Sequence, residues 1–102
     1  MVAVGVGMQG LADDGAGPPV PGLCHVAMVF VVPERWGRGI GGRIVDALIG
    51  AARDSGYDRA QLWTHDDNAR ARRLYERRDF RPSGRRKVDD SGETIVHYER
   101  TL

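Results

Sequence analysis

The stretch that decides the fold runs from Val29 to Gly42 and reads VFVVPERWGRGIGG. An apolar, β-branched run stops at Pro33, a glycine-rich turn follows, and an amphipathic pattern then begins. This succession predicts a strand, a tight loop and a helix N-terminus. A helix N-terminus has unpaired backbone N–H groups and a partial positive charge, and Gly37, Gly39 and Gly41 let a ligand come close to the backbone. The stretch therefore predicts an anion site, above all for phosphate or pyrophosphate.

Two common phosphate motifs do not fit this glycine-rich turn. No Gly-Lys-Ser or Gly-Lys-Thr follows the glycines, as the lysine P-loop requires. The run is G-R-G-I-G-G, which fits the dinucleotide fingerprint G-x-G-x-x-G poorly, and no repeated strand–helix units surround it. A turn whose glycines serve only the backbone is the alternative interpretation.

Charge and length limit the classes of protein that the chain can belong to. It has 102 residues, which predicts a single domain over 1–102, and a formal net charge of +1. The segment from Arg70 to Lys87 holds nine of the 15 Lys and Arg residues, counted along the sequence. A solvated helix face explains this segment best, and a counter-charge for a phosphorylated ligand comes second. Nucleic acid comes last, because the aromatic residues of the segment do not suggest base stacking.

Cysteine content and hydropathy indicate a cytoplasmic protein that does not bind membranes. The single cysteine, Cys24, lies in an apolar run and cannot form an internal disulfide, as suits a reducing compartment. The first eight residues lack a basic region and do not resemble a signal peptide. No apolar stretch reaches the length that spans a membrane.

Hydrophobic periodicity predicts alternating strands and helices. Strands are expected at 2–8, 23–32, 57–64, 80–87 and 94–101, helices at 37–55 and from 66 to about 78, and a loop at 11–22. Gly56 is expected just past the end of the first helix. The strand–helix–strand unit from 23 to 64 should be a right-handed crossover between parallel strands. The last two strands flank a turn, Asp89-Asp90-Ser91-Gly92, and should form a hairpin.

The glycine-rich turn resembles the acetyl-CoA loop of the GNAT superfamily of N-acetyltransferases. The family pattern, Gln/Arg-x-x-Gly-x-Gly/Ala after a strand and a proline, aligns with residues Trp36-Gly37-Arg38-Gly39-Ile40-Gly41. Trp36 stands where the family usually has Gln or Arg.

A second stretch resembles the family motif N-x-x-A-x-x-L-Y-x-x-x-G-F. Asn68, Ala71, Leu74, Tyr75 and Phe80 match at the right spacing. Asp79 replaces the usual glycine and should adopt the left-handed conformation at a cost of about 1 kcal/mol. The seven-residue spacing from Asn68 to Tyr75 should place both side chains on one helix face.

The resemblance covers Leu23 to Leu102 and implies the fold and the cofactor. The implied fold class is α/β (α+β), a GNAT-like mixed sheet with a central β-α-β crossover, two main helices and a C-terminal hairpin. Acetyl-CoA would lie between the two parallel strands where they splay apart. The residues implied to bind it are Val29, Phe30, Val31, Gly37, Arg38, Gly39, Ile40, Gly41, Gly42 and Asn68.

The resemblance also implies an enzyme and a mechanism. Acetyl-CoA would donate its acetyl group to an amine acceptor of unknown identity, and the N–H near Phe30 or Val31 would polarise the thioester carbonyl. Tyr75 would protonate the departing thiolate, although it can also be a core aromatic, and Asn68 can be only a helix cap. No covalent intermediate and no metal are needed, and no metal-ligand spacing joins the histidines and Cys24.

Two features of the family are missing from the sequence. Some members carry a catalytic Glu on the second parallel strand, where this chain has Trp63, so the general base stays open among His25, His65 and Asp66. The N-terminal strand and two helices that help to wall the acceptor site are also not found, which suggests a fragment or a homodimer that completes its site. A non-catalytic acyl-CoA-binding or structural remnant is therefore the alternative function.

Overall fold

The computed structural model describes residues 3–12, 16–31 and 39–102. They form five strands and two helices, namely β1 (Ala3–Leu11), β2 (Pro19–Val31), α1 (Ile40–Asp54), β3 (Arg59–His65), α2 (Ala69–Glu76), β4 (Arg81–Val88) and β5 (Thr94–Thr101). The predicted residues Trp36, Gly37 and Arg38 lie outside the described ranges.

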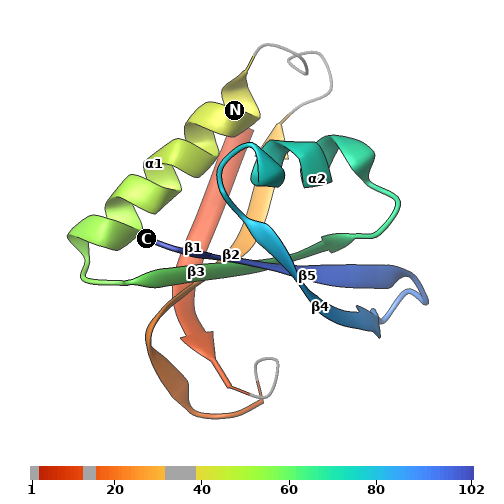
Figure 1. Cartoon of the computed structure of the whole chain (residues 1–102), viewed down its shortest axis with the longest axis horizontal. Helices are drawn as coiled ribbons and strands as arrows, with labels where there is room; N and C mark the ends of the chain where they lie inside the picture. Colours follow the sequence, from red (N-terminus) through yellow and green to blue (C-terminus); the bar gives the residue numbers. More distant parts are fainter. Residues whose placement is uncertain (1–2, 13–15, 32–38) are drawn as a thin grey trace.

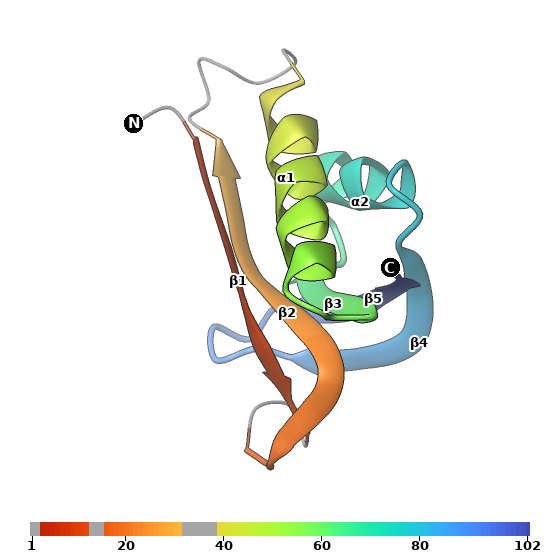
Figure 2. The ribbon, with the colours of Figure 1, turned by 90° about the vertical axis from the view of Figure 1, so that its left-hand side faces the viewer.

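The strands form one mixed sheet in the order β1-β2-β3-β5-β4. Only β2 and β3 pair in parallel, and the other neighbours are antiparallel. Both helices lie on the same face of this strongly twisted sheet, with α1 along β1 and β2 (Figures 1 and 2). The predicted fold class, with its β-α-β crossover and C-terminal hairpin, is confirmed.

The core lies between the helices and one face of the sheet. Val45 and Ile49 of α1 are buried in it, and Leu62 and Tyr98 supply the sheet side. Phe80, which follows α2, is fully buried and contacts this cluster from the other end. Alternation along β3 explains the arrangement, because Ala60 and Leu62 face the helices while Gln61 and Trp63 face the opposite side.

Each helix is followed by a residue in the left-handed conformation, at the position that the sequence predicts. Gly56 follows α1 with φ 90°, and the N–H groups of Gly56 and Tyr57 donate to the carbonyls of Arg53 and Ala52. These are the two bonds of a Schellman motif, which requires the left-handed conformation at this position. Asp79 has φ 66° after α2, so it adopts the left-handed conformation expected where the family has glycine.

Several predicted boundaries differ from the structure. The loop expected at 11–22 is shorter, because β1 continues to Leu11 and β2 begins at Pro19. Prolines can lie in this part of β2 because residues Pro19 to Gly22 come before Leu23, the first β2 residue that pairs with β3. The edge of β2 that faces β3 therefore needs no N–H donors there. Helix α1 begins at Ile40 rather than Gly37, and α2 ends at Glu76 rather than near Arg78.

Candidate functional site

The parallel strands β2 and β3 pair over a short length and then part. Their register joins Leu23 to Arg59, Cys24 to Ala60 and His25 to Gln61, and no further pair follows. Strand β3 continues to His65 against β5, while β2 runs on to Val31 against β1 (Figure 1). The edge of β2 from Val26 to Val31 therefore has no strand partner on its β3 side among the described residues.

This unpaired edge contains the predicted pantetheine-binding residues. Val29, Phe30 and Val31 pair with β1 on their other side. The register with β1 also skips Ala27, which is a β-bulge at the point where the strands separate. An extended ligand can occupy such an edge as an added strand, with main-chain hydrogen bonds.

The N-terminus of α1 has the geometry of an anion site. Gly39 is its N-cap residue, with φ 74°, and the first helical bond runs from the Arg43 N–H to the Gly39 carbonyl over 3.1 Å. The N–H groups of Ile40, Gly41 and Gly42 therefore have no partner within the helix. A Cβ on Gly39 would meet no atom of the described residues within 4 Å, so Gly39 leaves space on this side.

Gly42 has a different role from Gly39. It is buried, and a Cβ there would collide with the Arg78 guanidinium. Arg78 also donates from Nε to the Gly42 carbonyl, 3.0 Å away. The small size of Gly42 thus serves helix–helix packing, and only its N–H group remains for a ligand.

Asn68 and Tyr75 lie in different environments, although both belong to the second motif. Asn68 is exposed and is the N-cap of α2, with Oδ1 accepting from the Ala71 N–H at 3.1 Å. We predicted that both side chains share one helix face, but they differ in burial: Asn68 is exposed, whereas Tyr75 is only 8% exposed.

Tyr75 is buried in the core, but its hydroxyl is not sealed from solvent. Its ring packs edge-on against Phe80, with the centroids 5.9 Å apart. No described residue hydrogen bonds to the hydroxyl, and no fully buried side-chain N or O atom in the described ranges lacks a partner. The hydroxyl therefore keeps access to solvent. Burial raises the pKa of Tyr75, so the group is protonated near neutral pH.

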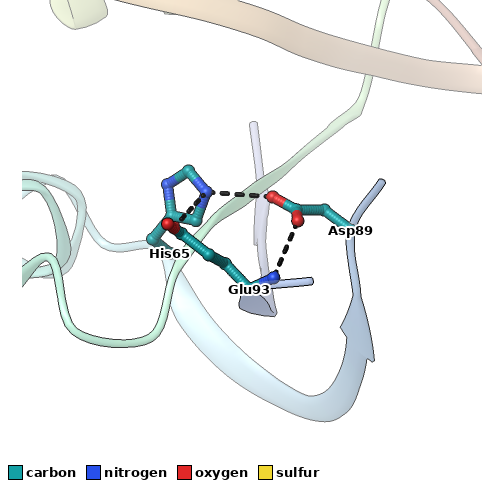
Figure 3. A group of neighbouring side chains, drawn as sticks. All are labelled: His65, Asp89 and Glu93. Carbon is teal, nitrogen blue, oxygen red and sulfur yellow. Dashed lines mark hydrogen bonds and ion pairs between the residues drawn. The ribbon is translucent and has the colours of Figure 1, made fainter. Parts of the chain in front are cut away.

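Two of the three candidate bases contact charged side chains of neighbouring elements. The Nε2 atom of His65 lies 3.0 Å from Asp89 and 3.3 Å from Glu93, both in the β4–β5 turn region (Figure 3). The Asp66 carboxylate pairs with Arg72 at 3.0 Å and with Arg86 at 2.8 Å. These ion pairs tie both groups to neighbouring elements rather than directing them toward the strand gap.

The group around His65 is also where the fold offers metal ligands. His65, Asp89 and Glu93 each present one ligand atom, and these atoms lie within 4.8 Å of one another. Among the described residues no other such group is found. Sequence spacing could not reveal it, because His65 lies far from the other two residues along the chain.

His25, the third candidate base, lies on the last rung that β2 shares with β3. It is half-buried, and its Nδ1 lies 3.4 Å from the Gln61 amide nitrogen. Burial lowers the pKa of His25, and the positive charge of Lys87 lowers it further. The imidazole is therefore neutral near neutral pH.

Sequence reasoning missed two polar residues that join His25, namely Gln61 and His97. Gln61 Oε1 accepts from His97 Nε2 at 2.9 Å, and the His97 side chain is 2% exposed. Their only sequence signal was the polar half of the alternation in β3 and β5, which a solvated sheet face would show equally.

Comparisons with known proteins agree with this fold. The family model described as the acetyltransferase (GNAT) family matches residues 3–80. The mycothiol acetyltransferase of Beutenbergia cavernae is 42% identical over 58 residues, which are 57% of this chain and 20% of that protein. The chain thus spans about a fifth of that curated relative.

Two solved structures share the fold. The NatC complex bound to Gag peptide and CoA aligns with a TM-score of 0.84 and 19% identity, covering 99% of this chain and 61% of that chain. Ard1 from Thermoplasma volcanium aligns with a TM-score of 0.84 and 16% identity, covering 99% and 63%. This chain thus spans about three-fifths of each structure.

Proposed function

Because the chain belongs to the acetyltransferase (GNAT) family, we propose that it is an acetyl-CoA-dependent N-acetyltransferase. It transfers the acetyl group to a primary amine of a small molecule or peptide, by direct attack within a ternary complex. The observation that carries the proposal is the gap between β2 and β3, followed by the N–H groups at the start of α1 that have no partner within the helix. An acyl-CoA needs both features, because its pantetheine arm is extended and its pyrophosphate is anionic.

Acetyl-CoA binds along the gap in this proposal. Its pyrophosphate accepts hydrogen bonds from the turn from Gly37 to Gly42, where Gly39 leaves open space for it. The pantetheine arm lies along Val29 and Val31, on the strand edge that β3 leaves unpaired. The exposed Asn68 contributes through its amide nitrogen, since its Oδ1 already caps α2. A solved structure of the same fold is bound to CoA, which supports an acyl-CoA as the co-substrate.

The chemical step needs one carbonyl-polarising donor and one acid. The neutral amine attacks the thioester carbon, the C–N bond forms, and the N–H near Phe30 or Val31 stabilises the oxygen that gains charge. The C–S bond then breaks, and Tyr75 donates its proton to the thiolate and regains one from solvent. Burial keeps Tyr75 protonated until that moment. The amine releases its proton to water, and no step uses a metal ion.

An amine panel with acetyl-CoA tests the proposal directly. Thiol release should rise above the rate without amine for at least one amine, and calorimetry on the same preparation should detect acetyl-CoA binding. Binding without turnover on any amine would contradict the enzyme and favour a non-catalytic acyl-CoA-binding remnant. Absence of binding would contradict the whole proposal.

The proposal includes a single domain over 1–102 that acts in the cytoplasm and self-associates. Met8, Leu11 and Val88 are apolar and 50%, 37% and 65% exposed, which is surface that a second copy can cover. Sedimentation should show association that strengthens with concentration, and a monomer at all concentrations would contradict a homodimer. No helix of the described ranges is long and apolar enough to cross a membrane.

A further inference from the structure

A row of four polar side chains crosses the sheet on the face away from the helices. Ser83 of β4 contacts His97 Nδ1 of β5 at 2.7 Å. His97 Nε2 contacts Gln61 Oε1 of β3 at 2.9 Å, and the Gln61 amide nitrogen contacts His25 Nδ1 of β2 at 3.4 Å. The row ends on the rung beyond which β2 and β3 separate.

The Gln61 amide determines where each proton in this row lies. Its oxygen only accepts, so His97 must donate from Nε2. Its nitrogen only donates, so His25 Nδ1 must accept. A neutral imidazole carries one proton, which for His25 is then on Nε2. The same rule leaves His97 Nδ1 as an acceptor, and Ser83 donates to it.

We propose that Ser83, His97 and Gln61 are positioning residues that hold the proton of His25 on Nε2, so that His25 is a neutral hydrogen-bond donor and not the general base. No described residue hydrogen bonds to the Nε2 atom of His25, and no fully buried side-chain N or O atom of the described ranges lacks a partner. Nε2 therefore reaches solvent, and the backbone of His25 lies on the last rung before β2 and β3 separate.

The charge around His25 indicates what its proton binds. Its neighbours in register, Met8 on β1 and Gln61 on β3, are uncharged. The charged group that acts on it is Lys87 of β4, which is positive. An N–H donor beside a positive charge favours an oxygen acceptor on the ligand. We therefore infer that the ligand is an amine that carries a carbonyl or carboxylate oxygen next to the reacting nitrogen. This identification of the ligand rests on the acetyl transfer proposed above.

Side-chain ¹⁵N NMR of the full chain tests the proton assignment without acetyl-CoA. Long-range ¹⁵N–¹H spectra near neutral pH should show His25 and His97 protonated on Nε2 only. His65→Asn identifies the signals of the third histidine and should leave the other two unchanged, because His65 pairs with the hairpin turn instead. A proton on His25 Nδ1 in the parent protein would overturn the proposal.

Gln61→Glu tests the hydrogen-bonded row of side chains. A carboxylate only accepts, so the His25 proton should move to Nδ1 while His97 keeps its proton on Nε2. The charge should also raise the pKa of His25. Gln61→Glu is nearly isosteric, and its far-ultraviolet spectrum checks that it folds. An unchanged His25 tautomer in the folded variant would overturn the proposal.

A matched pair of amines tests the ligand. Glycinamide carries a carbonyl next to its amine, and ethylamine does not. Glycinamide should shift the His25 Nε2 signal at concentrations at which ethylamine leaves it in place, and equal shifts would overturn this ligand class. These outcomes do not depend on turnover. An inactive protein would contradict the proposed function, but the NMR spectra would still test the position of the His25 proton.

Discussion

Arg78, two residues after α2, donates a hydrogen bond from Nε to the carbonyl oxygen of Gly42, which lies 3.0 Å away in the first turn of α1. The guanidinium occupies the space that a Cβ on Gly42 would fill. The same Nε lies 3.2 Å from Asp46 one turn later. One side chain therefore fixes the start of α1 against the end of α2, beside the proposed pyrophosphate site.

Gly42→Ala should be destabilising only while Arg78 is present. When Arg78 is present, the new methyl group displaces its guanidinium. The hydrogen bond from Arg78 to the carbonyl of residue 42 is then lost, at a cost of about 1 kcal/mol. In an Arg78→Ala background the same change should stabilise by up to about 1 kcal/mol, because alanine favours helix over glycine. Urea unfolding of the four proteins measures the cycle. Equal effects of Gly42→Ala in both backgrounds would show that the two residues are not coupled.

Gly39→Ala should weaken acetyl-CoA binding by about tenfold or more, which is about 1.4 kcal/mol. The methyl group would project into the open space where we place the pyrophosphate. Gly56→Ala is the matched control, because Gly56 also has positive φ and no atom within 4 Å of an added Cβ. Both variants should lose about 1 kcal/mol of stability from backbone strain. If calorimetry gives both variants the same affinity as the parent, the pyrophosphate lies elsewhere.

Tyr75→Phe should lower kcat by about 10²-fold with little change in acetyl-CoA affinity or stability. The hydroxyl acts mainly in the transition state in our proposal, and it has no hydrogen-bond partner among the described residues to lose. Tyr98→Phe is the opposite case, because the Tyr98 hydroxyl donates to Glu76 and accepts from Arg72. That variant should lose about 1–3 kcal/mol of stability and keep its kcat. Parent-like turnover by Tyr75→Phe would remove the acid role.

Acid should destabilise the β4–β5 hairpin through Asp89. Hydrogen bonds from Ser91 and from the Glu93 N–H, with a smaller effect of His65, lower the pKa of Asp89. A pKa lower in the folded than in the unfolded state means that the stabilisation is present above the unfolded value of about 3.9 and is lost as the pH falls further.

Asp89→Asn should therefore flatten the pH dependence of stability below about pH 4. Asp90→Asn, in the same turn, removes an equal charge outside this hydrogen-bond network and should keep the parent's pH dependence. Urea midpoints between pH 2 and 6 compare the three proteins. Parallel curves for Asp89→Asn and the parent would refute this account of the turn.

Local features of the chain were determined by sequence alone. The end of α1 before Gly56 and the left-handed Asp79 each depend on the conformational limits of one residue and its neighbours. The strand expected at 57–64 likewise agrees closely with β3 at Arg59–His65. Such signals survive without tertiary contacts because their physical cause is steric and local.

Only the tertiary structure decided which distant residues meet. The point where β2 leaves β3, after the rung of His25 and Gln61, depends on strand register and on the bulge at Ala27, and periodicity carries neither. Gln61 and His97 look like solvated positions in the sequence, yet the sheet joins them in one hydrogen-bonded row. Polar side chains on a strand alternate in the same way whether water or a neighbouring strand satisfies them, so only register and packing determine their role.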